Sequence, residues 1–129
     1  MVLELSDIDF SICKLTSFEN VDCTVPFSFF CLSDKEHSLI CPEYALPKNT
    51  MCSDNGWKMF RLGGQFEFSL TGILAGVADI LRDSNVPVMA TSTFDTDYFF
   101  VKKEFFARAI DALAAAGYQI ASLIVNARA

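Results

Sequence analysis

The sequence has few of the residues on which several common activities depend. Its 129 residues include one histidine, His37, and no Cys-x-x-Cys pair, so zinc ligation has little support. The histidine has no acidic or nucleophilic neighbour arranged for catalysis. We therefore expect no enzymatic activity, no catalytic residues, no cofactor and no metal.

Clustered basic residues are also missing. The chain carries 10 lysines and arginines against 16 aspartates and glutamates, a net charge of −6, and Lys102-Lys103 is the only adjacent basic pair. Nucleic-acid binding needs a basic stripe that displaces counterions, and an anionic membrane surface repels an acidic chain. We expect neither partner, whereas a small ligand with a positive group is compatible with this charge.

Long apolar runs are absent as well. No uninterrupted run approaches the ~20 residues of a membrane span, and the N-terminus, MVLELSDIDFS, lacks the basic start and apolar core of a signal peptide. The cysteines are odd in number, which favours reduced thiols at small core positions. These features predict a cytoplasmic protein; its five cysteines are Cys13, Cys23, Cys31, Cys41 and Cys52.

What the chain does have is apolar material: hydrophobic residues make up 52%, including 13 phenylalanines. This suits one compact domain or two very small lobes. The first half reads as strands over Phe10–Leu15, Phe27–Leu32 and His37–Cys41, the last two joined by a polar turn. Pro42–Gly56 contains two prolines and a terminal Asn-Gly, which predicts an irregular linker.

The second half has a clearer pattern. Apolar residues at helical spacing follow Ser69, a natural N-cap, and a second apolar seam precedes Gly117, a natural C-terminal cap. With the strands between them, the order β-α-β-β-α-β over residues 57–125 predicts an α+β, ferredoxin-like sandwich of four antiparallel strands and two helices. The expected strands are Trp57–Leu62 with Gln65–Phe68, Val86–Thr93, Tyr98–Val101 and Tyr118–Val125; the expected helices are Ser69 to about Ser84 and Glu104–Ala116.

Several motifs, taken in order, resemble a known family. They are CPE (Cys41–Glu43), GW (Gly56-Trp57), FSLTGILAGVADIL (Phe68–Leu81), ATSTFDTDYFFVK (Ala90–Lys102) and AIDALAAAGY (Ala109–Tyr118). The chain resembles small ACT-like proteins, often described as regulatory domains of the aspartokinase type, to which the cytosolic arginine sensors of animal cells are similar. The resemblance implies two ACT-like lobes: a reduced, strand-rich one over residues 1–56 and a complete βαββαβ one over residues 57–129.

The first candidate site is the predicted start of the helix after Phe68. A helix N-terminus presents unpaired amides and a positive dipole end, which suit a carboxylate, and a glycine here lets a ligand approach the backbone. An ordinary capped helix with glycines for close packing explains the same residues. The candidate carboxylate seat comprises Ser69, Leu70, Thr71, Gly72 and Ile73.

The second candidate site is the turn STFDTDY. Its Asp and Thr side chains suit an ordinary turn, but two carboxylates on one face of an extended segment repel and favour a cation between them. The ammonium, or a basic side chain, of an amino acid is the candidate cation; two carboxylates are weak evidence for a divalent metal. The residues involved are Ser92, Thr93, Asp95, Thr96 and Asp97.

Together these segments predict a clamp for a zwitterion. The resemblance implies a non-catalytic regulatory module that binds a free amino acid between lobes or subunits. Family members also pair their sheets or helices side by side, so a homodimer through a sheet edge or helix face is expected. The alternative is a ligand-free interaction or dimerisation module, since some members have no known ligand.

Overall fold

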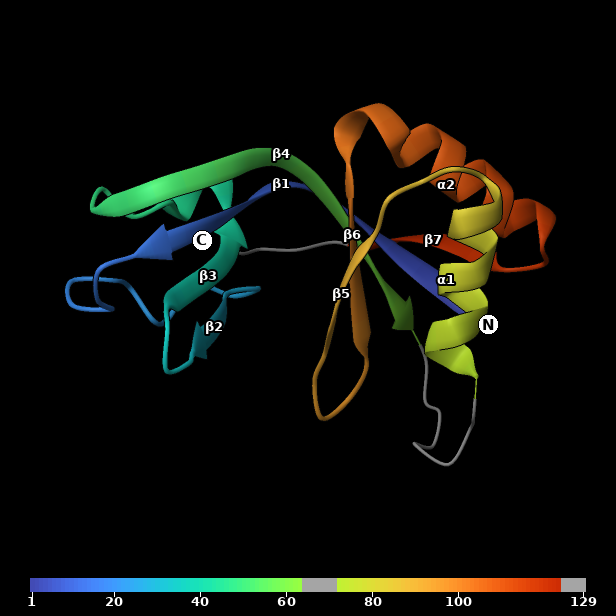
Figure 1. The fold of residues 1–129 in the computed structure, drawn as a ribbon. Helices are drawn as coiled ribbons and strands as arrows, with labels where there is room; N and C mark the ends of the chain where they lie inside the picture. Colours follow the sequence, from blue (N-terminus) through green and yellow to red (C-terminus); the bar gives the residue numbers. More distant parts are fainter. Residues whose placement is uncertain (64–71, 124–129) are drawn as a thin grey trace. The chain divides into compact units, whose positions relative to one another are not determined.

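Figure 1 shows the computed structural model, which describes residues 1–63 and 72–123. The described elements are β1 (Val2–Leu15), β2 (Phe29–Leu32), β3 (His37–Pro42), a short 3-10 helix (Glu43–Ala45), β4 (Thr50–Gly63), α1 (Ile73–Asp83), β5 (Met89–Ser92), β6 (Asp97–Lys102), α2 (Lys103–Ala115) and β7 (Gln119–Leu123). The strand expected over Gln65–Phe68 and the last two residues of the one expected to end at Val125 lie outside the described residues.

The chain divides into two compact units. In the described residues, unit 1 comprises Met1–Asp7 together with residues 58–63 and 72–123, and unit 2 comprises Ile8–Trp57. The two long strands β1 and β4 each contribute to both units. Leu3, near the N-terminus, is fully buried in the core of unit 1.

In unit 1 the strands follow the order β7-β1-β4-β6-β5. Helices α1 and α2 lie on the same side of these strands in Figure 1 and share one apolar core with them. This arrangement confirms the predicted α+β, ACT-like fold of the ferredoxin type. It differs in one respect: Val2–Ser6 of β1 pairs in parallel with β7, so the strands are not all antiparallel.

The two helices end where their sequence signals predict. Val77 and Leu81 are the buried residues of α1, and Asn85 after it has a left-handed φ of 59°. In α2, Ala109 and Leu113 are buried. Gly117, with φ 102°, lets the next amide return to the carbonyl of Leu113 over 3.1 Å, as a C-terminal cap does.

Unit 2 is made of strands in the order β2-β3-β1-β4. The buried residues Cys13, Leu15, Leu39 and Cys41 form its small core. Side chains from loops pack against this core; they are Phe18, Val21 and Leu46.

The expectation of an irregular linker over Pro42–Gly56 is wrong in its second part. Strand β4 starts at Thr50 and continues through the Asn-Gly pair to Gly63. Gly56 has φ 82° inside this strand, a conformation that β-bulges use. Its amide donates to the Glu43 carboxylate over 2.7 Å. Pairing with a distant strand therefore outweighs the local turn preference of these residues.

Candidate functional site

The β5–β6 hairpin carries the five polar candidates of the STFDTDY segment. Ser92 and Asp97 face each other as the last paired residues of the two strands. Between them, the Thr93 amide donates to the Thr96 carbonyl over 2.8 Å, and the Thr93 hydroxyl donates to the same carbonyl over 3.2 Å. The segment is therefore an ordered hairpin turn, whose side chains bond the turn's own backbone.

Thr96 fastens this turn to the neighbouring strand. Its side chain is buried, and its hydroxyl donates to the carbonyl of Leu62, near the end of β4, over 2.9 Å. Because β6 lies beside β4 in the sheet, this bond fixes the turn next to the point where β4 ends. Thr96 is thus a positioning residue, and its hydroxyl is directed to the backbone.

The two aspartates have different surroundings. Asp97 is half-buried and accepts a hydrogen bond of 2.5 Å from the Ser92 hydroxyl. Asp95 is exposed and lies in the turn, before β6 begins. Strand alternation was expected to send both carboxylates to one face, but it does not apply to Asp95 because that residue is not in the strand.

The helix start is displaced from the position that the sequence predicts. Gly72, not Ser69, is the N-cap of α1, with a left-handed φ of 81°. The first helical bond runs from the Gly76 amide to the Gly72 carbonyl over 2.7 Å. The first-turn amides that have no partner within the helix are therefore those of Ile73, Leu74 and Ala75.

Three residues of the predicted carboxylate seat lie outside the described residues: Ser69, Leu70 and Thr71. Gly72 and Ile73 are described, at the start of α1. Sequence reasoning missed Leu74 and Ala75 because it began the helix at the hydroxyl residue. The glycine was the available signal, since a left-handed residue is most easily supplied by glycine.

The two candidate segments lie at the same end of unit 1. Figure 1 shows the β5–β6 turn and the start of α1 both at the lower end of the unit as drawn, where β4 also ends. The positive end of the α1 dipole therefore faces the same edge of the sheet as the hairpin turn that carries Asp95 and Asp97. Groups of opposite polarity are thereby gathered at one edge.

A positively charged side chain near this edge, that of Arg61, was not identified from the sequence. The Arg61 Nε donates to the Glu4 carboxylate over 2.9 Å, and its Nη1 donates to the Tyr98 hydroxyl over 3.4 Å. Partial burial acts to lower the pKa of Arg61, but the hydrogen bonds to Glu4 and Tyr98 outweigh it and the pKa is raised. Arg61 therefore remains charged, next to the residue that follows Asp97.

Residues 1–63 and 72–123 contain no group of three or more histidine, cysteine, aspartate or glutamate side chains placed to hold a metal ion. Neither described helix is long and apolar enough to cross a membrane.

Comparison with known families finds a match. Residues 53–115 match the model of the ACT domain, and this segment contains both α1 and the β5–β6 hairpin. Over this segment the chain is similar to ACT domains. No curated protein matches the chain in sequence.

Solved structures share the fold of this chain. A protein of Agobacterium tumefaciens is 26% identical, with 95% of this chain and 93% of that one covered at a TM-score of 0.82. A Vibrio cholerae protein of unknown function, described as a possible transport protein, is 16% identical over 88% of both chains, with a TM-score of 0.68. The ligand-free regulatory subunit of Thermus thermophilus aspartate kinase is 7% identical over 91% of this chain and 97% of its own, with a TM-score of 0.65.

Proposed function

We propose that this protein is a non-catalytic regulatory module that binds a free amino acid at the end of unit 1 where α1 starts. The observation that carries the proposal is the bond from Thr96 to Leu62, which holds the acidic hairpin turn against the end of β4. The match to the ACT domain over residues 53–115 supports the regulatory role.

The two candidate segments offer complementary groups to a zwitterion. The first-turn amides of Ile73, Leu74 and Ala75 and the dipole of α1 suit the α-carboxylate. The carboxylates of Asp95 and Asp97 suit the ammonium, with hydroxyls of the turn as further partners. Ser69, Leu70 and Thr71 belong to the proposed seat as the residues just before the helix.

The overall charge favours one class of ligand. The chain carries a net charge of −6, and an acidic surface attracts cations more readily than anions. A basic amino acid such as arginine or lysine is therefore the preferred ligand among the twenty.

A thermal-shift scan with each of the twenty amino acids tests the proposal. A ligand that binds only the folded state raises the melting temperature in a concentration-dependent way. We expect this for at least one amino acid, and a flat response to all twenty would reject the proposal.

Asp97→Asn tests whether the ligand uses the hairpin turn. Losing a charge-assisted contact of roughly 1.5–3 kcal/mol weakens binding by at least tenfold. Asp111→Asn is the matched control because Asp111 is exposed on α2, away from both segments. Equal loss of affinity in both variants would indicate a general charge effect instead.

A second function, an interaction module without ligand, is favoured by exposed apolar side chains. Phe94, at the tip of the hairpin, is 87% exposed, and Leu32, on the edge strand β2, is 66% exposed. A homodimer formed through the β2 edge would cover the exposed side chain of Leu32. Light scattering distinguishes the two functions, because Leu32→Lys dissociates such a dimer whereas Asp97→Asn leaves it intact.

A further inference from the structure

All five cysteines of the chain lie in unit 2, and three of them lie on the adjacent strands β3, β1 and β4. Cys13 on β1 and Cys41 on β3 are buried in its core, whereas Cys52 on β4 is exposed. Strand β1 lies between β3 and β4. The central thiol, Cys13, therefore has one buried and one exposed thiol on the neighbouring strands.

Strands β1 and β4 bring Cys13 and Cys52 to the wall of the same pocket. The Ser11 hydroxyl contacts the Asp54 carbonyl at 3.4 Å and the Asn55 side chain at 2.5 Å. The two strands run in opposite directions (Figure 1). Cys13 lies two residues after Ser11 and Cys52 two residues before Asp54, so the two cysteines are near neighbours across the strands. Cross-strand neighbours can have Cβ atoms as close as about 4.5 Å, the upper end of the range of about 3.5–4.5 Å that a disulfide spans.

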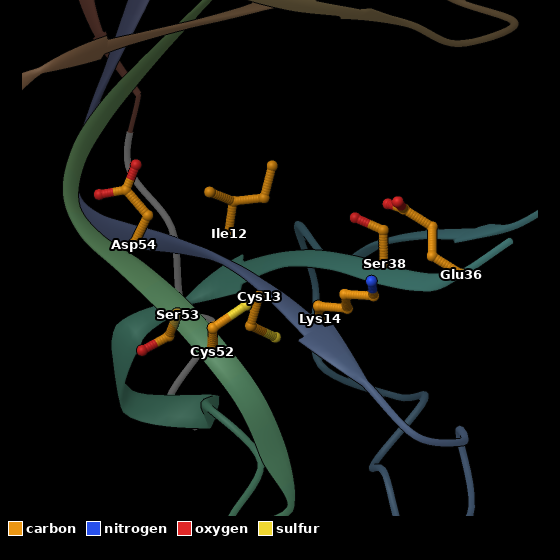
Figure 2. A pocket seen from close by; sticks show the side chains of 8 residues that line it. All are labelled: Ile12, Cys13, Lys14, Glu36, Ser38, Cys52, Ser53 and Asp54. Atoms are coloured by element: carbon orange, nitrogen blue, oxygen red, sulfur yellow. The ribbon is translucent and has the colours of Figure 1, made fainter.

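A pocket of about 260 Å³ gives small molecules access to this pair. Both thiols lie on its wall, and Figure 2 shows their side chains next to each other on the adjacent strands. A molecule the size of a peroxide fits in a pocket of this volume. The lining consists of Ile12, Cys13, Lys14, Glu36, Ser38, Cys52, Ser53 and Asp54.

The electrostatics agree with this proximity. Burial raises the pKa of Cys13, and the neighbouring Cys52 raises it further. Burial also raises the pKa of Cys41, to about 12, with a smaller effect from Cys13. Since the thiolate is the nucleophile, the exposed Cys52 is the group to react first, and Cys41 stays a protonated thiol at neutral pH.

We propose that Cys13 and Cys52 form a peroxide-responsive thiol pair, which closes to a disulfide between β1 and β4 at the wall of this pocket. The Cys52 thiolate attacks one peroxide oxygen, the O–O bond breaks, and the hydroxide leaves as water after taking up a proton. Cys52 is then a sulfenic acid. The Cys13 sulfur attacks the Cys52 sulfur, the S–O bond breaks, and a second water leaves with the Cys13 proton. Two thiols lose two electrons in total, and hydrogen peroxide is reduced to two waters.

Peptide mapping of the full chain after hydrogen peroxide treatment tests the proposal. Trypsin separates the cysteines cleanly, because Cys13 lies in peptide 1–14 and Cys52 in peptide 49–58, each without another cysteine. We expect these two peptides to be joined, with the loss of two hydrogen atoms, and to separate on reduction. The linked peptide should be the main oxidised product at low peroxide excess.

Two variants make the test specific. Cys52→Ser replaces an exposed side chain and should leave Cys13 as a free thiol after treatment. Cys31→Ser, exposed on β2, is the matched control and should leave the 1–14 to 49–58 link unchanged. A link from Cys52 to any other peptide, or Cys52 oxidised beyond the sulfenic acid with Cys13 still reduced, would overturn the proposal.

Discussion

The hydroxyl of Thr96 donates to the backbone carbonyl of Leu62 across 2.9 Å, and both residues are buried. This bond joins a turn to a strand that lies 34 residues earlier in the chain. It determines where the acidic hairpin turn lies relative to the end of β4, and therefore where the proposed ligand groups of that turn are held.

Thr96→Val tests this anchor. Valine keeps the shape of the side chain but removes the donor, so the buried carbonyl of Leu62 loses a hydrogen bond. We expect the free energy of unfolding to fall by about 1–3 kcal/mol, measured by urea denaturation. Thr91→Val is the control, because Thr91 is half-buried in β5 and valine suits a strand. Equal effects of the two substitutions would contradict the anchoring role.

Two glycines of the α1 segment should respond in opposite ways to alanine. Gly72 has φ 81°, where a Cβ is strained, so Gly72→Ala should destabilise the protein by about 1–2 kcal/mol. Gly76 lies within the helix, and among the described residues its added Cβ meets the Tyr118 hydroxyl at an ordinary 3.6 Å. Gly76→Ala should therefore stabilise the protein by about 0.5–1 kcal/mol. Thermal denaturation of both variants shows whether each substitution raises or lowers the stability of the protein. Stabilisation by Gly72→Ala would show that the cap is not left-handed.

The ion pair of Glu4 with Arg61 depends on the absence of a side chain at Gly63. A Cβ there would lie 2.8 Å from the Glu4 side chain and push it away from Arg61. Gly63→Ala should cost about 0.5–1 kcal/mol through this partly exposed pair. A double-mutant cycle with Glu4→Ala measures the coupling. If the changes in the free energy of unfolding from the two substitutions are strictly additive, Gly63 and Glu4 are not coupled and the prediction is wrong.

Stability should fall at alkaline pH because of Cys41. Burial raises its pKa in the folded state from 9.0 to about 12, so the folded chain keeps a proton that the unfolded chain loses above pH 9. The stabilisation is complete below pH 9 and is lost progressively as the pH rises toward 12. Between pH 9 and pH 10 the loss from this thiol is roughly 1 kcal/mol.

The measurement for this prediction is urea unfolding at the two pH values. Cys41→Ala should show a smaller decrease between them than the wild type. Cys31→Ala, with an exposed thiol, should behave as the wild type does. A decrease that is the same in Cys41→Ala as in the wild type would assign the effect to other groups.

The helices could be read from the sequence because their signals are local. The apolar spacing that buries Val77 and Leu81, and the glycine after α2, act within a few residues of chain. The ends of the strands were harder to predict from the sequence. β1 runs from Val2 to Leu15, yet only Phe10–Leu15 was predicted, since the polar residues Ser6 and Asp7 interrupt its apolar pattern.

The candidate site was predicted only in outline. Its residue types were visible in STFDTDY, but the role of Thr96 was not, because the partner that accepts its hydrogen bond is a backbone carbonyl far away in sequence. Arg61 was missed for the same reason: its partners Glu4 and Tyr98 lie on two other strands.

The sequence by itself determined the order of elements, the helix ends and the acidic, hydroxyl-rich character of one turn, because spacing, caps and charge act along the chain. Only the tertiary structure decided that β1 and β4 contribute to both units, that β7 pairs with β1, and that Cys13 and Cys52 line the same pocket. Those relationships depend on backbone hydrogen bonds and burial between segments more than thirty residues apart, and no local pattern specifies which strand pairs with which.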